Sequence, residues 1–296
     1  MLKKWNQSMG NEKSTAYLMV FPTAVIITLL GIGPILYVVW LSLCKVNPVT
    51  METEFAGLQN YTETLSNPGF WQSMGITFYF TIVSIALQLF LGVCVALLLN
   101  QDFRGRWLVR TLCILPWAVP TLVNANLWKW MLNTSYGIIN KLLIAFHIVD
   151  EGIFWLGDPK LTLNCVILVD TWRMLPMVTL MLLAALQTVS KSTLEAATMD
   201  GAGAVRRVLS VYLPSIKPML LVVLVLRTIQ AFRVFDIIFT MTKGGPDNGT
   251  MVISFYTYYE IYNYLNYGKG AAIALIILAA MLILSLIYMQ LLKEKD

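Results

Sequence analysis

Four long stretches of this chain contain no charged residue. They lie between Lys13 and Lys45, Glu63 and Asp102, Arg110 and Lys129, and Lys269 and Lys293. A membrane-spanning helix needs about 20 predominantly apolar residues, and each stretch can supply one. Only 12% of the residues are charged, whereas soluble domains have about a quarter. The chain is therefore predicted to be an integral membrane protein.

Two further segments are apolar but interrupted by charges. The segment around 162–186 contains Asp170 and Arg173, and the segment around 217–241 contains Arg227, Arg233 and Asp236. Each keeps a long apolar run, so both are interpreted as membrane helices. The predicted fold is all-α, with one polytopic transmembrane domain over 1–296. Its six helices are expected at about 16–43, 76–99, 109–131, 162–186, 217–241 and 270–292.

The lysines and arginines predict the orientation. Cytoplasmic loops carry an excess of these residues. With the N-terminus inside, twelve fall on the cytoplasmic side, including Lys293 and Lys295, six fall outside, and three lie within helices. Both termini and the loop at 187–217 are therefore predicted to be cytoplasmic. The positive charges behind the net charge of +5 are distributed as this topology requires. We therefore expect contact with membrane lipid and no nucleic-acid partner.

No catalytic or metal-binding constellation is evident. Cys44, Cys94, Cys113 and Cys165 lie in or beside apolar runs without the C-x-x-C spacing of a metal or redox site. Cysteines of this kind are most often buried small hydrophobes. The single histidine, His147, falls in a predicted loop. We therefore expect no enzymatic activity, no catalytic residue and no bound metal.

The polar loop between the two charge-interrupted segments has a distinctive spacing. Glu195-Ala196-Ala197 is followed three residues later by Gly201, and after nine more residues by Val211-x-Leu213-Pro214. Inside a polytopic protein, at a loop that the charges place in the cytoplasm, this complete spacing is highly specific.

Two short helices are predicted within this loop. Ser192 and Glu195 have the spacing of a capping box, and Gly201 and Gly203 can end the first helix because glycine tolerates a left-handed backbone. Pro214 is predicted to mark the turn into the next membrane helix. The second short helix would present one apolar stripe, formed by Val205, Val208, Leu209 and Tyr212.

This loop resembles the EAA loop of ABC importer permeases. The resemblance implies the type I permease fold and a cytoplasmic coupling loop at 190–214, which docks on a separate ATPase subunit. The candidate ATPase-coupling residues are Glu195, Ala196, Ala197, Asp200, Gly201, Leu213 and Pro214.

Further stretches are similar to the maltose-type, carbohydrate-uptake class of these permeases. They are Trp172-Arg173 with Pro176, Leu186-Gln187, Asp200-Gly201-Ala202, Phe235-Asp236 and Thr242-x-Gly-Gly-Pro246. The Gly-Gly-Pro segment is typical of the F-type half, here in a short six-helix form without the two extra N-terminal helices and the large periplasmic insertion of the maltose protein.

The resemblance also implies partners and a location. These are a second permease subunit, expected to be a G-type homologue, two ABC ATPase subunits, an extracytoplasmic solute-binding protein and the bacterial plasma (inner) membrane. The Walker A pattern G-x-x-x-x-G-K-[ST] does not occur in this chain. ATP is therefore expected to be used by a partner subunit, with no cofactor bound by this chain.

The resemblance places a solute pathway on two helices. By position, the substrate-pathway candidates are Arg173, Met174, Met177, Arg227, Gln230, Ala231 and Val234. Trp172 and Phe232 could supply aromatic platforms for sugar rings. Weaker pore candidates are Gln88, Trp117, Asn124, Asn126 and Trp128.

Ionisable residues inside membrane helices are costly and face a cavity or a partner. Asp170 and Arg173 are three residues apart, as are Arg233 and Asp236, a spacing that favours pairing within one helix. Arg227 has no carboxylate at such a spacing, so it is the preferred solute-binding candidate. The alternative, that Arg173 and Arg227 pair with Asp170, Asp236 or the other permease half, stays open.

The sequence thus predicts a permease subunit of an ATP-driven ABC importer for an oligosaccharide or related carbohydrate. It would form half of the translocation pathway. One alternative is an ABC permease for a polyol or a glycerol phosphate ester, since the arginines would suit an acidic ligand. Another is an ion-gradient-driven secondary transporter, for which inverted repeats would be expected. No clear repeat is present.

Overall fold

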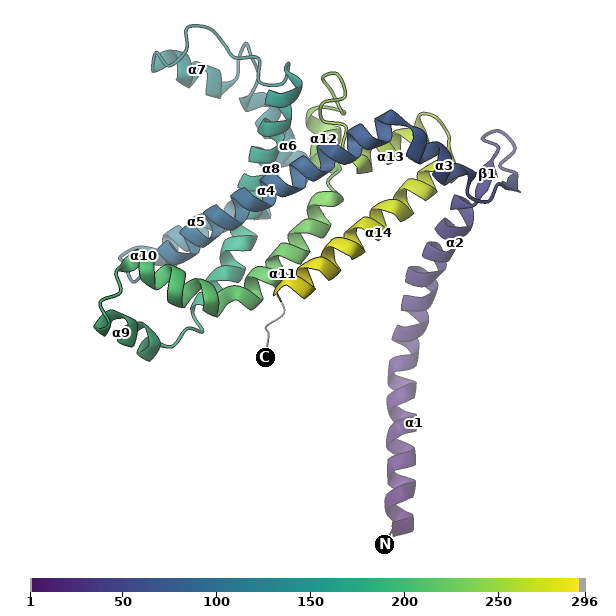
Figure 1. Cartoon of the computed structure of the whole chain (residues 1–296), viewed down its shortest axis with the longest axis horizontal. Helices are drawn as coiled ribbons and strands as arrows, with labels where there is room; N and C mark the ends of the chain where they lie inside the picture. Colours follow the sequence, from purple (N-terminus) through teal and green to yellow (C-terminus); the bar gives the residue numbers. More distant parts are fainter. Residues whose placement is uncertain (1, 293–296) are drawn as a thin grey trace. The chain divides into compact units, whose positions relative to one another are not determined.

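The computed structural model describes residues 2–292, so Lys293 and Lys295 lie outside the described residues. Five helical segments are long and apolar enough to cross a membrane: Thr15–Ser42, Pro68–Asn100, Pro159–Leu186, Ala204–Phe232 and Tyr267–Gln290. A bent pair of helices can supply a sixth crossing. The all-α polytopic fold is confirmed, with one short β-hairpin in addition (Figure 1).

The helices and strands belong to two compact units, one containing Glu260–Ile276 and the residues up to Ser66, the other containing Asn67–Tyr259 and the residues from Ile277 onward. In chain order the elements are α1 (Leu2–Ile27), η1 (Thr28–Ile32), α2 (Gly33–Ser42), β1 (Cys44–Val46), β2 (Thr53–Phe55), α3 (Gln59–Ser66), α4 (Pro68–Asn100), α5 (Arg106–Ala118), α6 (Thr121–Met131), α7 (Ile138–Ala145), α8 (Pro159–Leu186), α9 (Lys191–Met199), α10 (Ala204–Arg207), η2 (Val208–Tyr212), α11 (Leu213–Phe232), α12 (Asp236–Met241), α13 (Ile253–Tyr262) and α14 (Tyr267–Leu292).

In the first unit, the N-terminal helices lead into the β1–β2 hairpin, which pairs antiparallel with Lys45 opposite Glu54. The buried amide of Asn60 fixes the start of this hairpin, because its Nδ2 donates to the backbone oxygens of Ser42 and Cys44, each at 2.8 Å. Within the same unit, Lys269 Nζ lies 2.9 Å from Glu260 Oε1.

The helix expected at 109–131 is instead two helices, α5 and α6, bent by 96°. The break falls at Val119 and Pro120. A proline disfavours the helical conformation of the residue before it and has no N–H to continue the hydrogen-bond ladder. Val119 is accordingly extended, with φ −75° and ψ 126°. A charge-free run predicts the presence of a membrane segment, but not that it is straight.

The helix expected at 217–241 begins and ends earlier. A single helical span runs from Ala204 to Phe232, so Pro214 does not mark a turn. The turn before it is widened in η2, where the Leu213 N–H donates to the Val208 oxygen, five residues earlier. A wide turn of this kind accommodates a proline ring without breaking the helix. The helix ends at Phe232, with Arg233 at its C-cap, and α12 follows.

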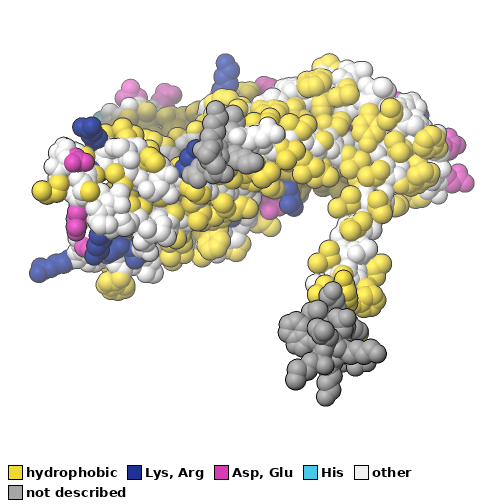
Figure 2. All heavy atoms as spheres, turned by 60° about the horizontal axis from the view of Figure 1, so that its bottom comes forward, with side chains coloured by type: hydrophobic (Ala, Val, Ile, Leu, Met, Phe, Trp, Pro, Cys, Tyr) yellow, Lys and Arg dark blue, Asp and Glu magenta, His cyan; other side chains and the backbone are white. Residues whose placement is uncertain are grey.

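The second unit is built around α4, α8 and α11. Helices α4 and α8 approach closely where Gly92 faces Val178, since a Cβ at Gly92 would lie 2.7 Å from the valine Cγ1. One apolar cluster includes Phe80, Ile237 and Phe255. A separate cluster, around Leu99 and Leu182, lies toward the other ends of these helices. On the face drawn in Figure 2, hydrophobic side chains dominate the visible surface, as expected for helices that contact lipid.

Candidate functional site

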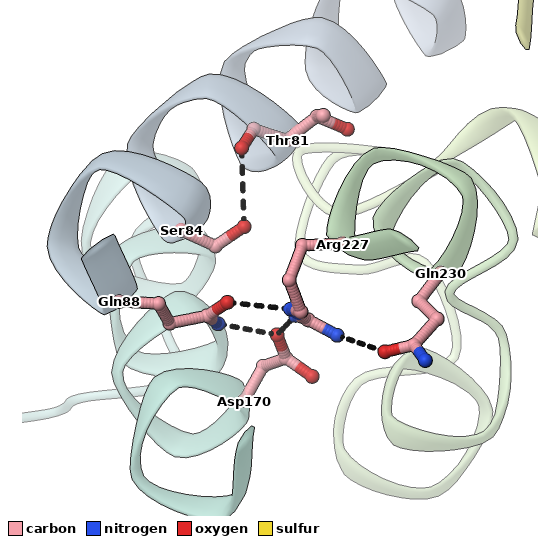
Figure 3. A network of polar contacts seen from close by, with 6 residues as sticks. All are labelled: Thr81, Ser84, Gln88, Asp170, Arg227 and Gln230. Atoms are coloured by element: carbon pink, nitrogen blue, oxygen red, sulfur yellow. Dashed lines mark hydrogen bonds and ion pairs between the residues drawn. The ribbon is translucent and has the colours of Figure 1, made fainter. Parts of the chain in front are cut away.

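Between the two apolar clusters, polar side chains from three helices meet at Arg227 (Figure 3). On α11, Arg227 lies one turn from Val223 of one cluster and one turn from Ala231 of the other. Only 1% of Arg227 is exposed. A buried guanidinium is stable only when hydrogen bonds and an opposite charge compensate for the lost water.

Each nitrogen of the Arg227 guanidinium has a partner. Nη2 lies 2.9 Å from Asp170 Oδ2 on α8, Nε donates to Gln88 Oε1 on α4 at 2.6 Å, and Nη1 donates to Gln230 Oε1 at 2.6 Å. Gln88 Nε2 also donates to Asp170 Oδ2, at 3.1 Å. The network therefore joins α4, α8 and α11 across the middle of the second unit.

Three residues of this network, Asp170, Arg227 and Gln230, border a cavity of about 300 Å³. It opens between α8, α11, α12 and the first residue of α6, so the bend in the α5–α6 pair and the end of α11 both help to form it. Eleven residues line it: Thr121, Asp170, Arg173, Met174, Arg227, Gln230, Arg233, Val234, Phe235, Asp236 and Ile237. Donors, acceptors and one aromatic ring thus surround a space large enough for a small polar solute.

Five of the predicted pathway residues lie around this cavity, namely Arg173, Met174, Arg227, Gln230 and Val234. Ala231 is buried in the apolar cluster instead, and Met177 is not among the lining residues. Asp170, Arg233 and Asp236 also line the cavity, as the rule that intramembrane charges face a cavity or a partner predicts. Phe235 lines it as well and is not one of the predicted pathway residues.

The expected pairing within one helix is wrong for both pairs. Among the described residues, Asp170 forms its ion pair with Arg227 rather than Arg173, and Arg173 Nε is buried without a hydrogen-bond partner. Arg233 and Asp236 are not ion-paired within the described part of the chain, because α11 ends before Arg233 and Asp236 begins α12.

The predicted aromatic platforms do not reach the cavity. Phe232 is fully buried and its ring lies 5.2 Å from that of Phe78. Trp172 packs edge-on against Trp128, with ring centroids 5.7 Å apart. Phe235 is the aromatic residue that lines the cavity. Its ring also lies 5.3 Å from that of Tyr258 on α13.

At one end of the second unit, α9 and α10 form an exposed helical hairpin (Figure 1). The predicted capping box at Ser192 is wrong. Helix α9 begins at Lys191, and Ser190 is its N-cap, with Oγ accepting from the Thr193 N–H at 3.2 Å. A capping box needs a Glu or Gln three residues after the N-cap. Because the N-cap is Ser190 rather than Ser192, that position is Thr193, and Glu195 is too far along the helix.

The C-terminus of α9 explains the glycine of the motif. Gly201 has φ +76°, a backbone region that only glycine adopts without strain. Its N–H donates to the Thr198 oxygen at 3.0 Å, and the Ala202 N–H donates to the Ala197 oxygen at 2.9 Å. This pair of bonds is a Schellman motif, which turns the chain sharply toward α10.

The hairpin presents apolar side chains at its surface. Met199 is 87% exposed, Val205 72% and Leu209 61%. The two arms are joined by Arg207 Nη1, which donates to Thr198 Oγ1 at 3.3 Å. Exposed apolar side chains on a short, internally bonded hairpin are typical of a surface that binds another protein. Leu213 and Pro214 lie where the second arm continues into α11.

Membrane-spanning helices around a polar cavity, with an exposed hairpin at one end, define a transport component of a membrane. Residues 88–294 match the family described as binding-protein-dependent transport system inner membrane component. The chain belongs to this family, and the resemblance to ABC importer permeases is confirmed.

Relatives cover nearly the whole chain. The trehalose/maltose transport system permease protein of Thermococcus litoralis is 38% identical over 94% of this chain and 94% of its own length. The sulfoquinovosyl glycerol transport system permease protein of Agrobacterium fabrum is 31% identical over 100% of this chain and 96% of its own. The crystal structure of a bacterial ABC transporter that imports alginate matches with a TM-score of 0.83 at 20% identity, covering 98% of both chains, and shows the same fold.

Proposed function

We propose that this chain is the permease subunit of an ABC importer for an oligosaccharide or related carbohydrate. The cavity between α8 and α11 carries the proposal. A sugar needs hydrogen-bond donors and acceptors for its hydroxyls and an aromatic face for its ring, and Arg173, Gln230, Asp236 and Phe235 supply these groups at one place inside the membrane domain. The relatives named for trehalose and maltose support the same substrate class.

The chain would form half of a translocation pathway, with a second permease subunit, expected to be a G-type homologue, as the other half. Two ATPase subunits would bind the α9–α10 hairpins, which places Glu195, Ala196, Ala197, Asp200 and Gly201 on the cytoplasmic side. An extracytoplasmic binding protein would deliver the sugar. One solved relative of this fold is complexed with a periplasmic protein that holds an alginate pentasaccharide, which supports this arrangement.

The test is uptake by the assembled transporter in proteoliposomes. With the partner permease, the ATPase and the binding protein present, ATP inside the vesicles is expected to drive uptake of radiolabelled maltose or trehalose. Vesicles that contain only this chain should take up neither sugar under a proton or sodium gradient. Gradient-driven uptake by the lone chain would contradict the proposal and favour a secondary transporter.

One observation favours an acidic solute as a second candidate. Arg173 Nε is buried without a partner, and Arg233 also lines the cavity. An importer for a glycerol phosphate ester would use these cations, whereas a neutral polyol would not need them. In the same proteoliposomes, glycerol 3-phosphate should compete with the sugar only if this second candidate is correct.

A further inference from the structure

Arg227 borders the cavity but offers it almost no surface. The side chain is 1% exposed, and each of its three nitrogens is bonded to a protein oxygen at 2.6–2.9 Å. A solute in the cavity would therefore meet the groups that Arg227 holds rather than Arg227 itself.

Among those groups, Gln230 is the one at the surface. Its side chain is exposed and lines the cavity. A guanidinium has donors but no acceptor. The amide oxygen of Gln230 must therefore face Arg227, and the NH₂ group must face away from it. Figure 3 shows this arrangement, with the Gln230 oxygen toward the guanidinium and the nitrogen on the opposite side.

The rest of the network prevents Arg227 from turning. Gln88 Oε1 accepts from Nε, and Gln88 Nε2 donates to the Asp170 oxygen that also accepts from Nη2. Gln88 is fully buried and Asp170 is 5% exposed. The plane of the guanidinium is thus fixed by partners on two other helices, so the direction of its bond to Gln230 is fixed as well.

We propose that Arg227 is a positioning residue, which orients Gln230 so that its NH₂ group donates to an oxygen of the transported solute. This inference rests on the proposed function, because it deepens the description of the same cavity. It assigns Arg227 a role different from direct contact with the sugar, and it gives Gln230 a donor role rather than an acceptor role.

The variant Gln230→Glu separates these roles. Glutamate has nearly the same shape and still offers an oxygen to Arg227, so the melting temperature of the assembled transporter should stay the same or rise. Toward the cavity, however, it replaces the NH₂ donor by an oxygen. The half-saturating concentration of maltose or trehalose should then rise about tenfold, the effect of one lost hydrogen bond. Gln101→Glu, at an exposed glutamine after α4, is the matched control and should change neither quantity.

Arg227→Lys tests the positioning itself. Lysine keeps the charge opposite Asp170 but cannot hold three acceptors in one plane. Gln230 should lose its fixed direction, and the half-saturating concentration should rise while the maximal uptake rate changes less. If Gln230→Glu lowers the melting temperature, or if neither variant changes the half-saturating concentration, the inference is wrong.

A measurement without sugar distinguishes failure of this inference from failure of the proposed function. The melting temperatures of Arg227→Lys, Gln230→Leu and the double variant form a cycle. If Arg227 holds Gln230, the two shifts should not add, because the double variant loses the same bond only once. Should the wild type carry neither sugar, the proposed substrate class fails, and the cycle still decides: additive shifts overturn the positioning role, and a coupling supports it.

Discussion

At the scale of single residues, the guanidinium of Arg227 donates to side chains on two other helices and to a neighbour on its own. The sequence predicts that the charges near it face inward, since ionisable groups in a membrane helix avoid lipid. It leaves Asp170 as one of several possible partners of Arg227, and it does not predict the bonds to Gln88 and Gln230. Asp170 is 57 residues away from Arg227, and Gln88 is 139 away. The rule for neighbours on one helix favours a pair between Asp170 and Arg173. Asp170 pairs with Arg227 instead, because α8 and α11 face each other there.

Gly201 can be tested at the same scale. The substitution Gly201→Ala places a Cβ on a backbone with φ +76°, which costs about 1–2 kcal/mol. We expect the turn between α9 and α10 to be distorted, with a dissociation constant for the ATPase subunit about tenfold higher in a pull-down titration and with normal insertion into the membrane.

Gly203 provides the control for this prediction. It lies two residues further on and has an ordinary φ of −63°, and a Cβ would meet no atom within 4 Å at either glycine. Gly203→Ala should therefore bind the ATPase like the wild type. Equal binding by the two variants would show that the left-handed turn is not needed for docking.

At the scale of helices, apolar runs predict where membrane segments occur, and prolines decide their shape by rules that depend on context. Pro120 breaks the predicted helix at 109–131, whereas Pro214 lies inside a continuous helix because the wider turn of η2 precedes it. The two cases cannot be distinguished from the proline alone. What differs is the residue before each proline: Val119 is extended, whereas Leu213 stays helical and bonds to Val208 five residues earlier.

The contact between α4 and α8 depends on a small residue. Gly92→Leu should push the helices apart, because even a Cβ there would lie 2.7 Å from Val178. Overpacking of this kind costs about 1–3 kcal/mol, and it should lower the melting temperature of the purified transporter.

A glycine on the same helix serves as the comparison. Gly75 has no atom within 4 Å of a Cβ position, so Gly75→Leu should leave the melting temperature unchanged. The smaller variant Gly92→Ala should also lower the melting temperature. Adding Val178→Ala to it should partly restore the melting temperature, because it makes room for the added methyl group. Equal destabilisation at Gly75 and Gly92 would show that close packing at Gly92 is unimportant.

At the scale of the whole molecule, the membrane segments and the coupling motif follow from the sequence, and the family resemblance predicts five of the residues that line the cavity, but not how the helices form it. Charge-free runs and the EAA spacing are patterns of residues close together in the chain, so they can be recognised in the sequence. The cavity forms only when the end of α11, the start of α6 and the middle of α8 come together in the fold. Phe235 illustrates the difference: the sequence marks it only as part of the family resemblance, and it lines the cavity because α11 ends at Phe232.

The orientation across the membrane gives a further prediction. In a variant with the four cysteines replaced by serine, Ile148→Cys and Met199→Cys would place thiols at positions that are 66% and 87% exposed. On intact spheroplasts, an impermeant maleimide should label position 148 and should reach position 199 only after permeabilisation. The reverse pattern would place the α9–α10 hairpin outside and contradict ATPase docking there.

The uninterrupted helical span from Ala204 to Phe232 has a mechanical consequence. Arg227 is separated from Ala204 by about 35 Å of helix, at 1.5 Å per residue. If the network around Arg227 acts as a pivot, a rotation of only about 10° there displaces the hairpin end by about 6 Å. The widened turn in η2 lies between the two ends, and there the regular four-residue hydrogen-bond spacing of the helix is interrupted. The stiffness of this turn would then decide how much of a hairpin movement driven by ATP hydrolysis is transmitted to the cavity, and how much only bends the helix.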